Sequence, residues 1–154
     1  MDMEKVRALR EKTGAGVMDV KKALDDAKGD EKEAEKLLKE RSVEIVAKKS
    51  ERETSQGLIE SYVHLGKIGV LVEINCETDF VARNDEFKAF AHEIALQIAT
   101  SEASEVDQLL EEEYFKEPGK IMRSLLDEVI AKTGENIRIQ RFTRYVLGES
   151  QEKK

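Results

Sequence analysis

Few side chains in this sequence have the type and spacing that covalent chemistry requires. The single cysteine, Cys76, follows a segment that carries His64, and cysteine–histidine pairs serve as nucleophiles in some enzymes. Such a pair also needs an orienting group and an oxyanion site, and the sequence indicates neither. We therefore interpret Cys76 as a partly buried small residue. The other histidine, His92, lies far from His64, which argues against a zinc site, and a lone cysteine excludes an intrachain disulfide.

Other motifs resemble ligand sites only in part. Gly14-Ala15-Gly16 lacks the third glycine and the preceding strand of a dinucleotide loop, and the end of a helix explains it better. The acids of residues 25–33 lack the glycine and the final glutamate of a calcium loop. Acid pairs such as Glu111 and Glu113 are typical of a solvated face. The sequence predicts no enzyme, cofactor or metal site.

One segment is unusual for its length and content. Residues 76–85, CETDFVARND, join a predicted strand to a predicted helix, where shorter connections are usual. We expect Asp79 to cap a short turn by accepting from the amide of Val81 or Ala82, which places Phe80 on an elbow before the helix. Two interpretations remain open: Phe80 or Val81 packs inward as a hydrophobic staple, or Phe80 is an exposed aromatic anchor.

The elements around these motifs suggest two modules. Residues 1–50 predict three short helices, near residues 3–13, residues 17–27 and from Asp30 onward, the third opened by Asp30 with Glu33. So small a bundle has no room for a pocket and is typical of a docking module. The third helix could extend past Val46 before a polar linker at residues 51–56.

Residues 57–154 predict an α+β core. Residues 57–65 and 68–76 alternate at period two, and Gly66-Lys67 fits a type II′ hairpin turn. Helices are expected at residues 85–100, 105–114 and 119–133, with Pro118 ending the second. A last strand at 136–147 contains a phase slip between Ile139 and Phe142, which predicts a bulge. These strands predict a three-stranded antiparallel sheet with helices on one face.

Composition and sheet coverage narrow the possible partners. The 154 residues are 38% charged with a net charge of −7, which disfavours general nucleic-acid binding. No apolar run is long enough to span a membrane, and the first residues lack the apolar stretch of a signal peptide, so we expect a cytoplasmic protein. Because two or three helices cannot cover both faces of the sheet, its second face predicts a protein partner or a homodimer.

Three motifs resemble one family. Residues 9–24 (LREKTGAGVMDVKKAL), residues 75–84 (NCETDFVARN), and Gly134-Glu135-Asn136-Ile137 with Arg141-Phe142 are similar to signatures of bacterial elongation factor Ts. Together the motifs span the chain from end to end. The resemblance implies a guanine nucleotide exchange factor for elongation factor Tu that performs no covalent chemistry and begins with a ubiquitin-associated-like bundle.

The resemblance also implies where the partner binds. In the family, the residues that match Asp79 and Phe80 insert between helices of the GTP-binding domain of elongation factor Tu and disturb its magnesium site. This assigns partner binding to Thr78, Asp79, Phe80 and Val81, and it favours the exposed anchor. A second contact with the same domain is implied for the N-terminal bundle, at these four residues: Arg10, Thr13, Val17 and Met18.

The chain departs from the longer members of that family, which carry two core repeats and further C-terminal elements. Short members pair as homodimers, which agrees with the uncovered sheet face. The alternative function, from a different class, is a scaffold that binds a helix or tail and exchanges no nucleotide. Release of GDP from elongation factor Tu separates the two.

Overall fold

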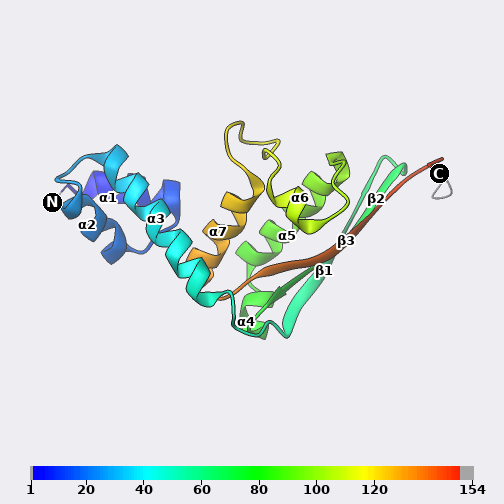
Figure 1. The fold of residues 1–154 in the computed structure, drawn as a ribbon, viewed down its shortest axis with the longest axis horizontal. Coiled ribbons are helices and arrows are strands. Elements are labelled where there is room, and N and C mark those ends of the chain that lie inside the picture. The colour runs from blue at the N-terminus through cyan, green and yellow to red at the C-terminus, as the bar shows by residue number, and fades with distance from the viewer. Residues whose placement is uncertain (1, 150–154) are drawn as a thin grey trace. The chain divides into compact units, whose positions relative to one another are not determined.

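The computed structural model describes residues 2–149, apart from the side chains of Ser42 and Ile45 (Figure 1). The described chain forms two compact units. Of the described residues, one unit contains 2–52 and 127–136, and the other contains 53–126 and 137–149. Residues 127–136 therefore group with the N-terminal helices, a relation that the sequence pattern did not predict.

The first unit is built on three helices: α1 (Met3–Thr13), α2 (Val17–Asp26) and α3 (Glu31–Lys49). As predicted, Asp30 caps α3, since its carboxylate accepts from the amides of Lys32 and Glu33. The third helix also extends to Lys49, as expected. The buried side chains of the bundle are Val6, Leu9, Val20, Ala23, Leu24, Ala27, Ala34 and Leu38.

The turn between α1 and α2 depends on a glycine. Gly14 has φ of +72° and its amide donates to the Arg10 carbonyl, so it ends α1 as the sequence predicts. The Lys132 side chain also lies against it, because a Cβ at Gly14 would stand 2.3 Å from Lys132 Cε. Asn136, nearly fully buried, donates to the Arg52 carbonyl at 2.8 Å. These contacts attach the end of α7 (Met122–Thr133) and the residues after it to this unit.

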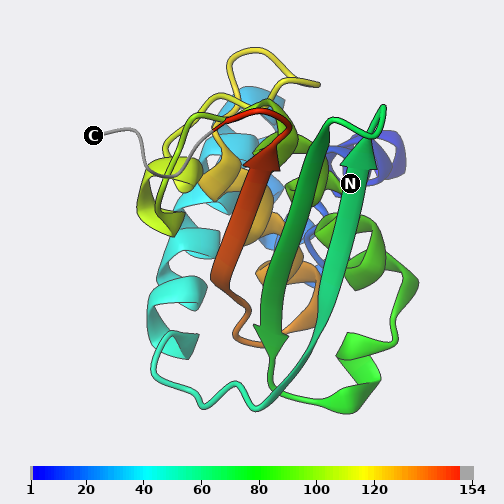
Figure 2. The ribbon, with the colours of Figure 1, turned by 90° about the vertical axis from the view of Figure 1, so that its right-hand side faces the viewer.

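The second unit is an α+β layer around a three-stranded antiparallel sheet, as predicted. Its strands β1 (Gln56–His64), β2 (Ile68–Cys76) and β3 (Arg138–Val146) lie in the order β1-β2-β3. Helices α4 (Asp79–Ala82) and α5 (Asp85–Thr100) pack on β1 and β2, and α6 (Val106–Leu110) contacts β3. The helices of this unit pack on one face of the sheet, and the strands lie in front in Figure 2, so no helix of the same unit covers the face toward the viewer.

The two faces of the sheet differ in burial. Val70, Val72 and Ile74 of β2 are buried under the helices, and Phe87 and Ile94 of α5 are fully buried. The side chains on the other side of the sheet, here called the outer face, are Ile59, Ser61, Val63, Leu71, Glu73, Arg141, Thr143 and Tyr145. Ile59 and Val63 thus lie on the face opposite to Val70 and Val72. The alternation of the sequence predicts Ile59, Ser61 and Val63 against Val70, Val72 and Ile74, and this is wrong. Ile59 pairs with Glu73 and Val63 with Gly69, so these β1 side chains are solvent-facing.

The predicted bulge is confirmed. Ile139 pairs with Ile74 and Arg141 pairs with the preceding Glu73, so Gln140 is the extra residue. The predicted hairpin turn is wrong by one residue. Its central residues are Leu65 and Gly66, with φ of +52° and +69°, and the Lys67 amide donates to the His64 carbonyl. Two positive φ values make this a type I′ turn, in which leucine is costly.

The helix predicted at residues 105–114 is present but shorter than predicted, because α6 ends at Leu110. Beyond the helix, buried Gln97 of α5 donates to the Glu112 side chain and the Glu113 carbonyl, at 3.1 and 3.2 Å. Tyr114 then donates to Glu93 at 2.7 Å. Burial favours the neutral Glu93 carboxyl, but hydrogen bonds from Lys116 and Tyr114 outweigh it and hold its pKa below the usual value. Burial and the Glu93 carboxylate raise the pKa of Tyr114.

We expect Gly57→Ala to destabilise the protein by about 1–3 kcal/mol. Gly57 has φ of +150°, and a Cβ there would stand 2.2 Å from the Ile74 carbonyl oxygen and 2.7 Å from Asn75 Cα. Both are backbone atoms of β2, so the strands must separate. Gly69→Ala is the matched control, since nothing lies within 4 Å of its Cβ position. Urea denaturation of both variants checks this, and equal midpoints would contradict it.

None of the described helices is long and apolar enough to cross a membrane. Within residues 2–149, no three His, Cys, Asp or Glu side chains gather in a way that could hold a metal ion.

Candidate protein-binding site

Within residues 76–85, the chain forms a single helical turn, α4, which is capped at its start and followed directly by the cap of α5. Thr78 is its N-cap, with the hydroxyl accepting from the Val81 amide at 3.3 Å. Asn84 then caps α5 by accepting from the Glu86 amide at 2.7 Å. The predicted cap, Asp79, is therefore wrong: Asp79 is the first residue of the helix, and threonine one position earlier does the capping.

The base of α4 is packed against the second unit. Ala82 is its one buried side chain, and α4 contacts β1, β2 and α5. The chain enters from Cys76, which is fully buried and donates from Sγ to the Thr78 carbonyl at 3.2 Å. Figure 1 shows α4 at the end of the sheet, between β2 and α5. A turn of four residues has little stability of its own, so these caps and contacts determine its shape.

Phe80 points away from the protein. Its side chain is 82% exposed, so a staple by Phe80 is wrong and the exposed position is confirmed. Val81 is half-buried. A cation lies over the Phe80 ring, since the Arg83 guanidinium carbon is 6.0 Å from the ring centroid, at the outer limit of a cation–π interaction. Arg83 Nη2 also pairs with the Asp79 carboxylate at 2.9 Å. The turn therefore presents a carboxylate and an aromatic ring together, both in water.

The N-terminal candidates surround the turn between α1 and α2. Thr13 supports that turn, because its hydroxyl donates to the Leu9 carbonyl at 2.6 Å and accepts from the Ala15 amide. Arg10 Nε donates to the Ala15 carbonyl at 3.4 Å. Val17 packs partly on the bundle core, whereas Met18 is 75% exposed. The structure thus brings Arg10, Thr13, Val17 and Met18 together in the first unit and Thr78, Asp79, Phe80 and Val81 together in the second.

The outer face of the sheet is a second apolar surface of the same unit. Its exposed apolar side chains are Ile59, Val63, Leu71 and Tyr145, and Leu65 and Leu147 stand exposed beyond the strand ends. An ion pair between Arg141 and Glu73, at 2.8 Å, crosses this face.

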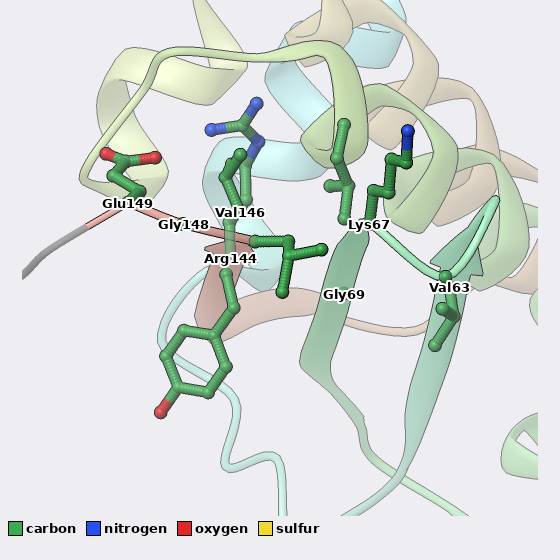
Figure 3. Close-up of a pocket in the computed structure, with 11 residues that line it drawn as sticks. Val63, Lys67, Gly69, Arg144, Val146, Gly148 and Glu149 are labelled. Carbon is green, nitrogen blue, oxygen red and sulfur yellow. The ribbon is translucent and has the colours of Figure 1, made fainter.

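At the hairpin end the outer face continues into a groove of about 720 Å³, bordered by Val63, Lys67, Arg144 and Leu147 (Figure 3). An apolar surface of this kind on a monomer usually marks an interaction site.

Sequence reasoning missed Arg83 and Leu65. Arg83 follows Asp79 by four positions and Phe80 by three, the spacings at which helical side chains meet, so the pattern was available. Leu65 was placed before the turn rather than inside it, and only the register of the hairpin reveals its positive φ.

The family model and the similar proteins that match this chain all carry the same name. The family model described as "Elongation factor TS" matches residues 77–153. Elongation factor Ts of Alkaliphilus oremlandii is 42% identical over 194 aligned positions, which cover 97% of this chain and 90% of that protein. Elongation factor Ts of Rubrobacter xylanophilus is 41% identical over 191 positions, which cover 94% and 98%. The Anaeromyxobacter protein of the same name is 42% identical, with coverage of 97% and 89%.

These alignments are longer than the chain itself, which has 154 residues. The relatives therefore carry residues within the aligned region that this chain lacks. The matches nevertheless run over nearly the whole chain and most of each relative. The chain belongs to the elongation factor Ts family of translation factors.

Proposed function

We propose that this protein is a guanine nucleotide exchange factor that binds elongation factor Tu·GDP and promotes release of GDP. The proposal rests on one observation: the Phe80 side chain is 82% exposed, although the turn that carries it is capped and packed against the second unit. A large apolar side chain held in water gains free energy when a partner buries it, and such aromatic anchors dominate binding energies.

The proposed action of α4 is insertion into the partner. Thr78 and the half-buried Val81 support the turn, and Phe80 enters between helices of the GTP-binding domain, where its ring and the Asp79 carboxylate disturb the magnesium and nucleotide site. No covalent step is needed. An exchange factor has only to bind the nucleotide-free partner better than the nucleotide-bound one.

The N-terminal helices supply a second contact in this proposal. Residues 1–50 act as a ubiquitin-associated-like docking domain, joined through residues 51–56 to the core at 57–154. Arg10 and Met18 are exposed and available for contact, while Thr13 and Val17 shape the turn that presents them. Two docking surfaces explain how a small anchor can be held on its target, because linked contacts reinforce each other.

The proposed assembly is a homodimer through the outer face of the sheet. The apolar side chains of that face lie on all three strands, and a twofold pair would cover them without leaving a surface open for further addition. This gives the core a second sheet in place of the second repeat of longer family members. The protein acts in the cytoplasm and contacts neither membrane nor nucleic acid in this proposal.

The proposal predicts that exchange is reciprocal. Catalytic amounts of the protein should speed release of labelled GDP from elongation factor Tu, and GDP with magnesium should weaken the complex by the same factor. Titrating the complex at several GDP concentrations measures both effects. An affinity that does not change with GDP would instead identify a scaffold that binds and exchanges nothing.

A further inference from the structure

We propose that Arg83 is a positioning residue that holds Phe80 and Asp79 in the conformation that enters the partner; this inference rests on the proposed function of α4. Arg83 is the C-cap of α4, and its amide donates to the Asp79 carbonyl at 3.1 Å. Its backbone is therefore fixed relative to the turn, and its side chain extends back over the residues that precede it.

Both contacts of the guanidinium fall on the proposed binding residues. One nitrogen, Nη2, pairs with Asp79 Oδ2 at 2.9 Å, and the same group lies over the Phe80 ring with its carbon 6.0 Å from the centroid. A planar guanidinium can stack on a ring and bind a carboxylate at once, which an ammonium cannot do equally well. One side chain thus orients the two groups that the partner is to receive.

Phe80 needs such support because the protein offers it little else. The ring is 82% exposed, and the one buried side chain of α4, Ala82, points the other way. An unsupported ring would sample several rotamers in water, and fixing one of them on binding costs free energy. Contact with Arg83 reduces that cost before the partner arrives.

The contacts of Arg83 are too exposed to stabilise the whole fold. The Arg83 and Asp79 side chains are 68% and 59% exposed, and ion pairs of this kind contribute little to the free energy of unfolding. Removing Arg83 should therefore alter the ring and leave the melting temperature unchanged. A residue with a merely structural role would show the opposite result.

The motion of the ring can be measured in the free protein. The chain contains no tryptophan, so Phe80→Trp introduces a single indole at the position of interest, and long-wavelength excitation selects it over the three tyrosines. Time-resolved anisotropy of the full chain should show that the indole tumbles mainly with the protein. Adding Arg83→Ala should enlarge the fast local decay, as should high salt, which screens the exposed pair. Arg83→Lys, which keeps the charge and loses the planar group, should restore only part of the order.

Arg123→Ala is the matched control. Arg123 is a partly exposed arginine of the same unit and pairs with Glu111 at 2.9 Å, so its loss removes an ion pair of the same length elsewhere. It should not change the indole decay. If Arg83→Ala lowers the melting temperature, the measurement uses Arg83→Gln instead, which removes the guanidinium and keeps a longer polar side chain. An indole decay that is the same with and without the guanidinium overturns the proposal.

Exchange measurements test the consequence for binding. Arg83→Ala should slow GDP release at low factor concentration by roughly two- to tenfold, the cost of ordering one side chain. In a Phe80→Ala background the further loss should be clearly smaller, because only the orientation of Asp79 then depends on Arg83. An equal loss in both backgrounds would mean that Arg83 contacts the partner itself, which overturns positioning. If the unaltered protein releases no GDP, the proposed function fails, while the anisotropy still decides the role of Arg83.

Discussion

Phe80→Ala should lower GDP release from elongation factor Tu by at least about tenfold and leave the melting temperature unchanged. Exchange should fall because the ring is the proposed anchor in the partner. The melting temperature should stay the same because the ring is 82% exposed, so its removal creates no cavity in this protein. The variant should also bind elongation factor Tu more weakly. Stopped-flow release of labelled GDP, with a thermal melt of the same sample, measures both quantities.

Phe87→Ala is the matched control for this prediction. Phe87 is a fully buried phenylalanine of α5, a few residues beyond the turn, and its truncation should destabilise the fold by about 3–5 kcal/mol. Exchange per folded molecule should then stay near normal. If Phe80→Ala unfolds the protein while its folded fraction exchanges normally, Phe80 supports the fold and the proposed insertion is wrong.

Leu71→Lys should convert the proposed homodimer into a monomer, weakening self-association by more than about 100-fold. Leu71 lies at the middle of the central strand on the outer face, half exposed, opposite Ser61 and Thr143. A lysine there can reach water in the monomer, so the fold should survive. Pairing of two sheets would bury the ammonium group without a partner, which is costly.

The measurement is sedimentation at micromolar concentration, where the unaltered chain should exceed its monomer mass of 17.5 kDa. Val43→Lys provides the control, since Val43 is a similarly exposed apolar residue on α3. It should not change the mass. A monomeric unaltered protein would remove the dimer from the proposal and with it the account of how one core repeat suffices.

The sequence predicted most helices and strands because their signals are local. Helix α5 has the predicted bounds, 85–100, since it contains an apolar stripe with period 3.6 and Asn84 caps it from the preceding position. The bulge in β3 was visible as a shift in the alternation of apolar residues. The path of the chain after α6 was not visible, because Glu112 and Glu113 accept hydrogen bonds from Gln97, a residue of another helix.

The candidate site could be located but not oriented from sequence. The spacing of residues 76–85 indicated a turn before α5, yet whether Phe80 or a neighbour packs inward depends on which side of that turn rests on β1 and β2. The structure gives that place to Ala82. The turn of the hairpin was misplaced for a related reason: Gly66 fits either central position, and the hydrogen bond from the Lys67 amide to the His64 carbonyl selects the second.

The bulge at Gln140 has a consequence for how the length of β3 could change during evolution. In a regular strand, loss of one residue moves every later side chain to the opposite face. Gln140 is the extra residue against β2, so its deletion would leave Phe142 toward the helices and Arg141 and Thr143 on the outer face. Deletion of Thr143 would instead exchange the faces of Arg144 and Tyr145. Of these two positions in β3, only the bulge can lose a residue and keep both surfaces of the sheet intact.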